Sequence, residues 1–242
     1  MKATHKHILH LAVLAMFAAP AFAQTAAAPA AKADTTSSAA KQNKAASRHV
    51  SDAIAVVHKL DGEQRIHRVL GDAKGVFIVP SYGRAAVGVG AAGGTGVLLV
   101  RQPNGGWSDP IFYTTGGLSV GLQAGAEGGA LVLVLNNEKA LNEFLKKNNF
   151  SLNAKAGLTV VNWNKMVQGS AGTGDVVAWS DTKGLFGDIA TVEVNDIRFN
   201  QRLTNAYYHR SLSASDVIDG MTSNPQAQPL VKALVAVAEP AR

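Results

Sequence analysis

The chain has 242 residues, a formal net charge of +6 (23 Lys and Arg against 17 Asp and Glu) and no cysteine. The absence of cysteine excludes disulfides, thiolate catalysis and cysteine-ligated metal sites, so the core alone must stabilise the fold. The charge is mildly basic. It favours anionic surfaces such as phospholipid headgroups but falls short of the dense basic surface of a nucleic-acid-binding protein.

Residues 1–23 have the three parts of a secretory signal peptide. Lys2 and Lys6 precede an apolar segment from Ile8 to Ala19, and Ala21-Phe22-Ala23 forms a cleavage motif of the A-x-A type. The apolar segment is too short to span a bilayer. We therefore expect cleavage near Ala23 and a mature protein that is periplasmic or secreted.

Two further regions follow the signal. Residues 24–48 are rich in Ala, Ser, Thr and Lys and have almost no large apolar side chain. Such a segment cannot bury enough surface to offset the entropy lost on ordering, so we predict a disordered tether. Residues 49–238 then form a single domain of ordinary size.

The domain opens with two short helical patterns, over 51–60 and 63–70, separated by Asp61-Gly62. From Gly71 onward, glycine and β-branched residues become dense, which favours strands. We expect strands over 75–79, 85–90, 96–101, 120–126 and 130–135, with a further strand opening at Trp107. The glycine pairs Gly93-Gly94 and Gly128-Gly129 are predicted to form hairpin turns.

The second half of the domain mixes helices and strands. Residues 137–147 predict an amphipathic helix that faces Ala140, Leu141, Phe144 and Leu145 inward. Strands are expected over 158–161, 176–179 and 189–194, and helices over 215–218 and 229–237. The predicted fold is α+β: an antiparallel, glycine-rich sheet, curled or barrel-like, with N-terminal, central and C-terminal helices packed around it.

Two strings in the glycine-rich region match catalytic motifs without their structural context. Residues 88–93 match the dinucleotide fingerprint, which must open a helix. Residues 117–121 match the nucleophile elbow, which needs a strand-to-helix turn around Ser119. Strand-like residues follow both strings, so we expect no nucleotide cofactor and no catalytic serine.

The remaining polar residues give no catalytic constellation. His49, His58 and His67 are spaced nine residues apart, which is two and a half helical turns, so neighbours point to opposite sides and cannot share a metal. Glu127 is a lone carboxylate that we interpret as a turn or rim residue, with a partner Arg or Lys inside the sheet as the alternative. The sequence predicts a protein that is not an enzyme and has no metal or cofactor.

Seven segments in register resemble the SYLF domain family. They are residues 73–80, 88–99, 107–110, 121–127, 131–136, 183–187 and 205–208, and the resemblance runs from about Val69 to Gly220. It implies a non-enzymatic lipid-binding module. Eukaryotic members bind phosphoinositides and yeast members also bind actin, but export puts actin out of reach of this chain. Asp109 and Thr182 depart from the usual family pattern.

The resemblance also implies where lipid would bind. Membrane contact in the family is attributed to the N-terminal helical part, so Lys59, Arg65, Arg68 and Lys74 are candidate lipid-binding residues that would meet phosphate groups. Ile54, Val57, Ile66 and Val69 would then contact acyl chains or the domain core.

Three alternatives stay open. These helices could simply cover one end of the sheet, with their charges solvated. The protein could instead be a periplasmic carrier that encloses a lipid in its curled sheet. It could also be a structural or adhesive envelope protein that binds an unknown protein partner.

Overall fold

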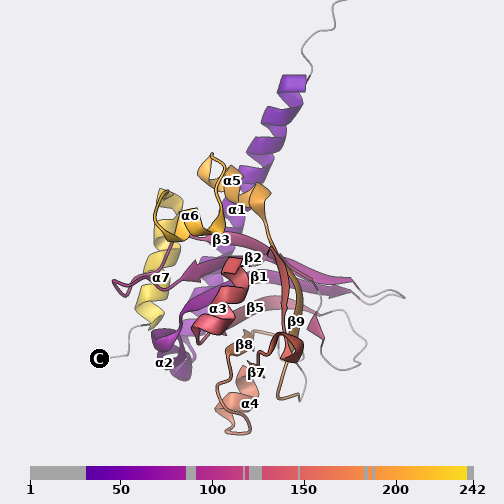
Figure 1. Cartoon of the computed structure of the whole chain (residues 1–242), viewed down its shortest axis with the longest axis vertical. Helices are drawn as coiled ribbons and strands as arrows, with labels where there is room; N and C mark the ends of the chain where they lie inside the picture. The colour runs from indigo at the N-terminus through magenta and orange to yellow at the C-terminus, as the bar shows by residue number, and fades with distance from the viewer. Residues whose placement is uncertain are drawn as a thin grey trace, which may run out of the picture.

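The computed structural model describes residues 31–85, 91–116, 118–119, 127–146, 148–182, 185–186 and 189–238 (Figure 1). The predicted signal peptide, the strand predicted over 120–126 and most of the strand predicted over 85–90 lie outside these residues. The helices are α1 (Ala31–Asp61), α2 (Gln64–Asp72), α3 (Glu138–Lys146), α4 (Trp163–Val167), α5 (Gln201–Tyr208), α6 (Ala214–Ile218) and α7 (Gln228–Ala238), with short 3-10 turns η1 (Ala154–Ala156) and η2 (Pro225–Ala227).

The strands form one strongly curved sheet. They are β1 (Gly75–Ala85), β2 (Ala91–Val100), β3 (Ile111–Thr115), β4 (Leu118–Ser119), β5 (Glu127–Leu135), β6 (Asn149–Leu152), β7 (Val160–Asn162), β8 (Val176–Ser180) and β9 (Glu193–Phe199). Their order is β4-β9-β3-β2-β1-β5-β8-β7, with β6 also paired to β9. All these pairs are antiparallel except β7 with β8.

The sheet nearly closes into a barrel. β7 lies at one end of the strand order, yet the Asn162 N–H donates to Ala190 O and the Val192 N–H donates to Val160 O, both at 2.9 Å. Residues 190–192 lead directly into β9, near the other end of the order. The predicted α+β fold with a curled, barrel-like sheet and surrounding helices is therefore confirmed.

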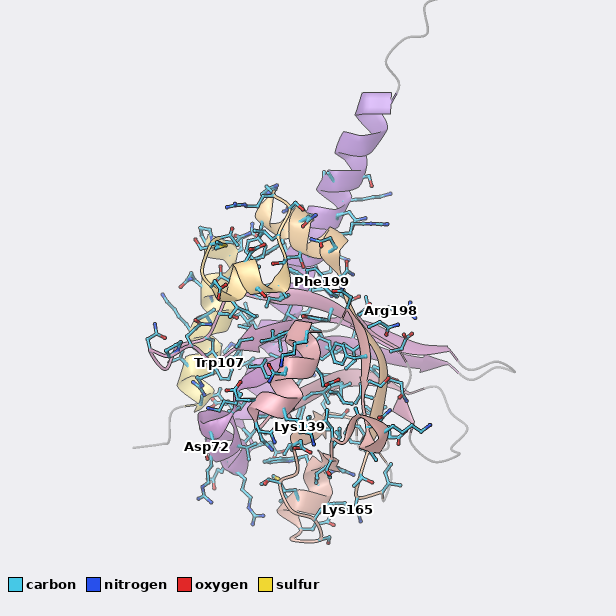
Figure 2. All side chains as sticks on the ribbon, viewed as in Figure 1. Asp72, Trp107, Lys139, Lys165, Arg198 and Phe199 are labelled. Carbon is cyan, nitrogen blue, oxygen red and sulfur yellow. The ribbon has the colours of Figure 1, made fainter. Side chains whose placement is uncertain are left out.

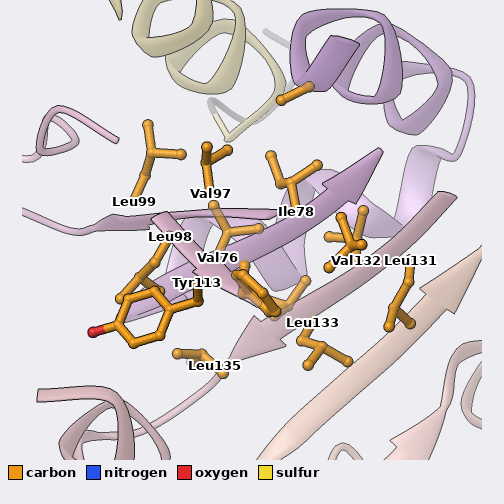
Figure 3. Packing of buried hydrophobic residues seen from close by; sticks show 14 of the residues in the cluster. Val76, Ile78, Val97, Leu98, Leu99, Tyr113, Leu131, Val132, Leu133 and Leu135 are labelled. Atoms are coloured by element: carbon orange, nitrogen blue, oxygen red, sulfur yellow. The ribbon is translucent and has the colours of Figure 1, made fainter. Parts of the chain in front are cut away.

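Alternation along the strands divides the core into two layers. Ile78, Val97 and Leu99 point toward the helices that cover the outer face of the sheet, whereas Leu98 and Tyr113 point to the opposite side (Figure 3). All five side chains are buried. Helices α1, α2 and α7 pack on one another, and α1 also packs on β1 and β2.

Aromatic rings fill the inner layer. Phe144 of α3 lies 5.4 Å from Phe77, 5.2 Å from Tyr113 and 4.8 Å from Phe150, measured between ring centroids. Phe199 of β9 adds a fifth ring, 5.6 Å from Tyr113. Because these rings come from α3 and from four strands spread around the sheet, they meet inside its curve. The Tyr113 hydroxyl donates to Phe144 O at 2.8 Å, which ties α3 to β3.

The prediction that the two glycine pairs form turns is wrong. Gly94 lies inside β2, opposite Thr115, and Gly129 lies inside β5, opposite Tyr82. A Cβ on Gly94 would come within 2.5 Å of Val79 Cγ1, and one on Gly129 within 2.6 Å of Asp181 Oδ1. These glycines therefore allow neighbouring segments to approach closely beside the irregularity that β1 has between Ile78 and Gly83.

Helix α1 begins at Ala31, so residues 31–48 are helical and differ from the predicted disordered tether. Alanine has the highest helix propensity, and tertiary contacts hold the helix from Asn43 onward. Ala46 is fully buried, the Asn43 side chain donates to Ala206 O at 2.9 Å, and the Ser47 hydroxyl donates to Gln226 Oε1 at 2.8 Å. The first part of α1 extends beyond the body of the protein (Figure 1).

Candidate functional site

The four residues predicted to bind lipid lie around α2, and we call them the α2 set. Lys59 is near the end of α1, Arg65 and Arg68 are on α2, and Lys74 directly precedes β1. Lys59 Nζ donates to Asp181 Oδ2 at 2.6 Å, and the other oxygen of Asp181 accepts the Ala130 N–H at 2.7 Å. Lys59 therefore fastens α1 to the sheet.

Two more members of the α2 set have internal partners. Arg65 donates to Val167 O at the end of α4, and Lys74 Nζ lies 3.8 Å from Glu138 Oε1. Arg68 is exposed and has no polar partner in the described part of the chain. Asp61, Glu63 and Asp72 lie in or next to α2 in the chain and Asp181 pairs with Lys59, so these acids offset part of the positive charge of the α2 set.

Helix α2 is also anchored through its apolar face and its C-terminal end. Leu70 of this face is fully buried. Of the residues predicted to contact acyl chains or the core, Val57 and Ile66 are fully buried in the core, and Ile54 and Val69 are partly buried and pack against it. Arg101 donates to the carbonyls of Leu70, Gly71 and Ala73, and its guanidinium lies 4.0 Å above the Trp107 ring. Burial lowers the pKa of Arg101, and the nearby Asp72 carboxylate opposes that shift.

A second basic surface lies on α1, where the sequence had predicted a tether. Lys41, Lys44 and Arg48, which we call the α1 stripe, are spaced by three and four residues and so share one face of the helix. All three are exposed and have no ion-pair partner among the described residues. Figure 2 shows nitrogen-tipped side chains on α1 where the helix leaves the body of the protein. The spacing is visible in the sequence, but it places the three cations on one face only because residues 31–48 are helical.

A groove of about 850 Å³ lies between α1 and α5. Its lining residues are Ser38, Ala39, Ala40, Gln42 and Asn43 on one side and Arg202, Asn205, Ala206 and His209 on the other. A smaller hollow of about 450 Å³ adjoins it, shares Gln42 and Arg202, and reaches Thr114 and Arg198. No sequence motif pointed to this groove, because residues 38–43 and 202–209 are far apart in the chain.

His209 is one of the residues that line the groove. It follows the last residue of α5 with φ 54°, a left-handed conformation that is uncommon for residues other than glycine. Its Nε2 lies 3.4 Å from the Asn43 side-chain nitrogen. The end of α5 is therefore turned toward α1.

The other candidate residues do not form a site in the described part of the chain. His49 is half-buried, with its pKa lowered by burial, His58 is exposed, and His67 Nε2 lies 3.4 Å from Asp61 Oδ1. Over the residues described above, no three side chains of the metal-binding types come together. Leu118 and Ser119 of the elbow motif lie in β4, paired with β9, whereas its residues 117, 120 and 121, and residues 88–90 of the other motif, fall outside the described ranges. The side chain of Glu127 also falls outside them.

No helix within the described ranges is both long and apolar enough to cross a membrane. The nearly closed sheet with its packed interior, together with the basic face of α1, defines an α+β domain whose candidate sites among the described residues lie on the surface.

The chain belongs to the Ysc84 (SYLF) family, which confirms the motif resemblance. The family profile, described as "Las17-binding protein actin regulator", matches residues 116–237.

Curated relatives include SH3 domain-containing YSC84-like protein 1 of Homo sapiens and of Bos taurus, each 29% identical over 175 residues. These matches cover 71% of this chain and 51% of each relative. Protein YSC84 of Saccharomyces cerevisiae is 27% identical over 172 residues, covering 69% of this chain and 36% of the relative. The chain spans about half the length, or less, of these curated relatives.

Proposed function

We propose that this protein binds anionic phospholipid surfaces without catalysis, acting as an exported SYLF-family domain. The observation that carries the proposal is the α1 stripe: three exposed cations on one face of a helix that extends from the body. Export is supported by the signal-peptide pattern of residues 1–23.

The α1 stripe is a better candidate for membrane contact than the α2 set. A basic residue near an anionic surface contributes about 1 kcal/mol, so the stripe supplies about 3 kcal/mol. Lys59 and Lys74 already pair with carboxylates, and Arg65 donates to a backbone carbonyl, so their charges are partly committed. Binding through a stripe of this kind is sensitive to salt, because exposed charges are screened within about 10 Å at 0.1 M ionic strength.

Vesicle sedimentation of the purified protein tests the proposal. We expect binding to phosphatidylglycerol vesicles at low salt, weaker binding at high salt, and little binding to phosphatidylcholine. A triple variant with Lys41→Gln, Lys44→Gln and Arg48→Gln should lose most of this binding.

The matched control carries Arg65→Gln, Arg68→Gln and Lys74→Gln. It removes the same number of positive charges and leaves the Lys59–Asp181 pair intact. This control should keep most of the binding. If only the control lost vesicle binding, the α2 set would be the lipid-binding surface. A wild-type protein that binds neither kind of vesicle would refute the proposed function.

The alternative of an enclosed lipid has less support. The interior of the sheet holds the ring cluster of Phe77, Tyr113, Phe144, Phe150 and Phe199. An acyl chain would have to displace these rings. Actin binding, which the family description suggests, is not proposed for this chain because an exported protein would not meet actin.

A further inference from the structure

The groove between α1 and α5 offers hydrogen-bond donors and acceptors together. The Asn205 side-chain oxygen already accepts from Gln201 Nε2 at 2.7 Å and from the Leu212 N–H at 3.1 Å, which leaves its NH₂ group to donate. The Asn43 NH₂ group already donates to Ala206 O, which leaves the Asn43 oxygen to accept. The Asn205 side chain can thus donate to a ligand, and the Asn43 side chain can accept from one.

This pairing favours a peptide over a phosphate or a carboxylate alone. A peptide backbone presents an N–H donor and a C=O acceptor at almost every residue, whereas a phosphate dianion presents acceptors only. Small side chains, Ala39, Ala40 and Ala206, line the groove between these amides and leave room for a backbone to come close. The groove is open and continues into the second hollow, which suits an extended segment.

The charges of the groove indicate that the segment is acidic. Arg202 lines both hollows, is exposed, and has no polar partner among the described residues. A guanidinium matches a carboxylate in a two-pronged geometry. No Asp or Glu is among the described residues that line either hollow.

We propose that the α1–α5 groove is a docking site for an extended acidic segment of a partner protein. Arg202 binds a carboxylate of that segment, and Asn43 and Asn205 bind its backbone. This site is separate from lipid binding by the α1 stripe, whose three residues do not line the groove.

The test uses a fluorescein-labelled octapeptide of alternating glutamate and alanine, with a lysine–alanine octapeptide as the negative probe. Fluorescence anisotropy measures affinity, and ¹H–¹⁵N spectra of the whole protein locate the bound peptide. We expect the acidic peptide alone to bind and to shift amide signals of residues 38–43 and 202–209. Arg202→Gln should weaken binding about tenfold, as expected for the loss of a charge-assisted contact with a carboxylate at an exposed site.

Two further variants separate a docking site from general attraction between charges. Ala40→Trp fills the groove at an exposed helical position without changing the charge, and it should also weaken binding about tenfold or more. Lys232→Gln removes one exposed charge on α7 and should weaken binding less than about twofold. Thermal melting of each variant verifies that the fold is intact.

Three results would overturn the proposal. One is equal weakening by Lys232→Gln and Arg202→Gln, and another is unchanged affinity in Ala40→Trp. The third is a shift of the groove signals by phosphatidylglycerol vesicles but not by the peptide, which would assign the groove to the membrane surface. Failure of peptide binding and failure of vesicle binding are distinguishable, because the three substitutions in the α1 stripe leave the residues that line the groove unchanged.

Discussion

Arg101 is expected to be a main support of α2, the helix that carries Arg65 and Arg68. Its guanidinium joins the C-terminal carbonyls of α2 to the loop before β3, through Leu70 O on one side and Gly105 O at 2.9 Å on the other. It also covers the Trp107 ring at 4.0 Å. Arg101→Met keeps the aliphatic stem and removes all of these interactions.

The expected loss follows from those contacts. Two short charged hydrogen bonds at a half-buried site contribute about 1 kcal/mol each, and the cation–π contact adds about 0.5–1 kcal/mol. The longer contacts to Gly71 O and Ala73 O, at 3.3 and 3.4 Å, are left out of this sum. We therefore expect Arg101→Met to lower the free energy of unfolding by about 3 kcal/mol. Arg101→Lys keeps the positive charge but not the planar set of N–H donors, and it should lower that free energy by about half as much.

Urea denaturation at neutral pH measures the stability, and hydrogen exchange of the α2 amides measures the local effect. Exchange should accelerate over residues 66–72 more than in the central strands β1 and β5. Arg198→Met is the control, because Arg198 forms an exposed ion pair with Asp196 and its loss should cost less than about 1 kcal/mol. A loss of stability in Arg101→Met no greater than in this control, or α2 amides that keep their protection, would refute this role of Arg101.

Two more predictions concern the sheet and one carboxylate. A Cβ on Gly96 would come within 2.8 Å of the Phe77 ring and closer still to Ile78 O, so Gly96→Ala should destabilise the protein by about 1–3 kcal/mol in urea. Gly83→Ala, whose Cβ meets no atom within 4 Å, should change stability by less than about 1 kcal/mol, and equal losses would contradict the explanation. Burial raises the pKa of Asp109, with the Asn224 N–H opposing the shift, so the ionised carboxylate destabilises the folded state above that pKa and ceases to do so as the pH falls. Asp109→Asn keeps an acceptor for the Asn224 N–H and should raise the melting temperature at about pH 7. This gain should vanish toward about pH 4, where the wild-type carboxyl is protonated in the folded state. A gain that does not change with pH would rule out the buried charge as its cause.

Local patterns predicted the elements whose apolar residues repeat at regular spacing. Helices α2, α3 and α7 lie where the periodicity placed them, and the buried face of α3 includes Ala140, Leu141 and Phe144 as expected. The side chain of Asn137 accepts the Ala140 N–H at 3.0 Å and so caps the start of α3. Such features follow from neighbours three or four residues apart, which a single sequence displays.

The basic residues show what local patterns do not reveal. Lys59 and Lys74 looked available in the sequence, but their carboxylate partners, Asp181 and Glu138, lie 122 and 64 positions further along the chain. The α1 stripe could not be predicted from the sequence, because residues 31–48 have too few apolar side chains to indicate a packed helix. Its helical state is supported by contacts with Ala206 and Gln226, which only the folded chain supplies.

The fold class and the family follow from the amino-acid sequence alone, because glycine and β-branched density favours a closely packed sheet and the motifs lie in register along the chain. The roles of the individual glycines and cations depend on the folded chain. The register of the strands decides whether a glycine lies in a turn or within a strand that a neighbouring segment approaches closely. Gly94 and Gly129 lie within strands. The α1–α5 groove depends on the same kind of long-range pairing, since it exists only where Asn43 meets Ala206 and His209.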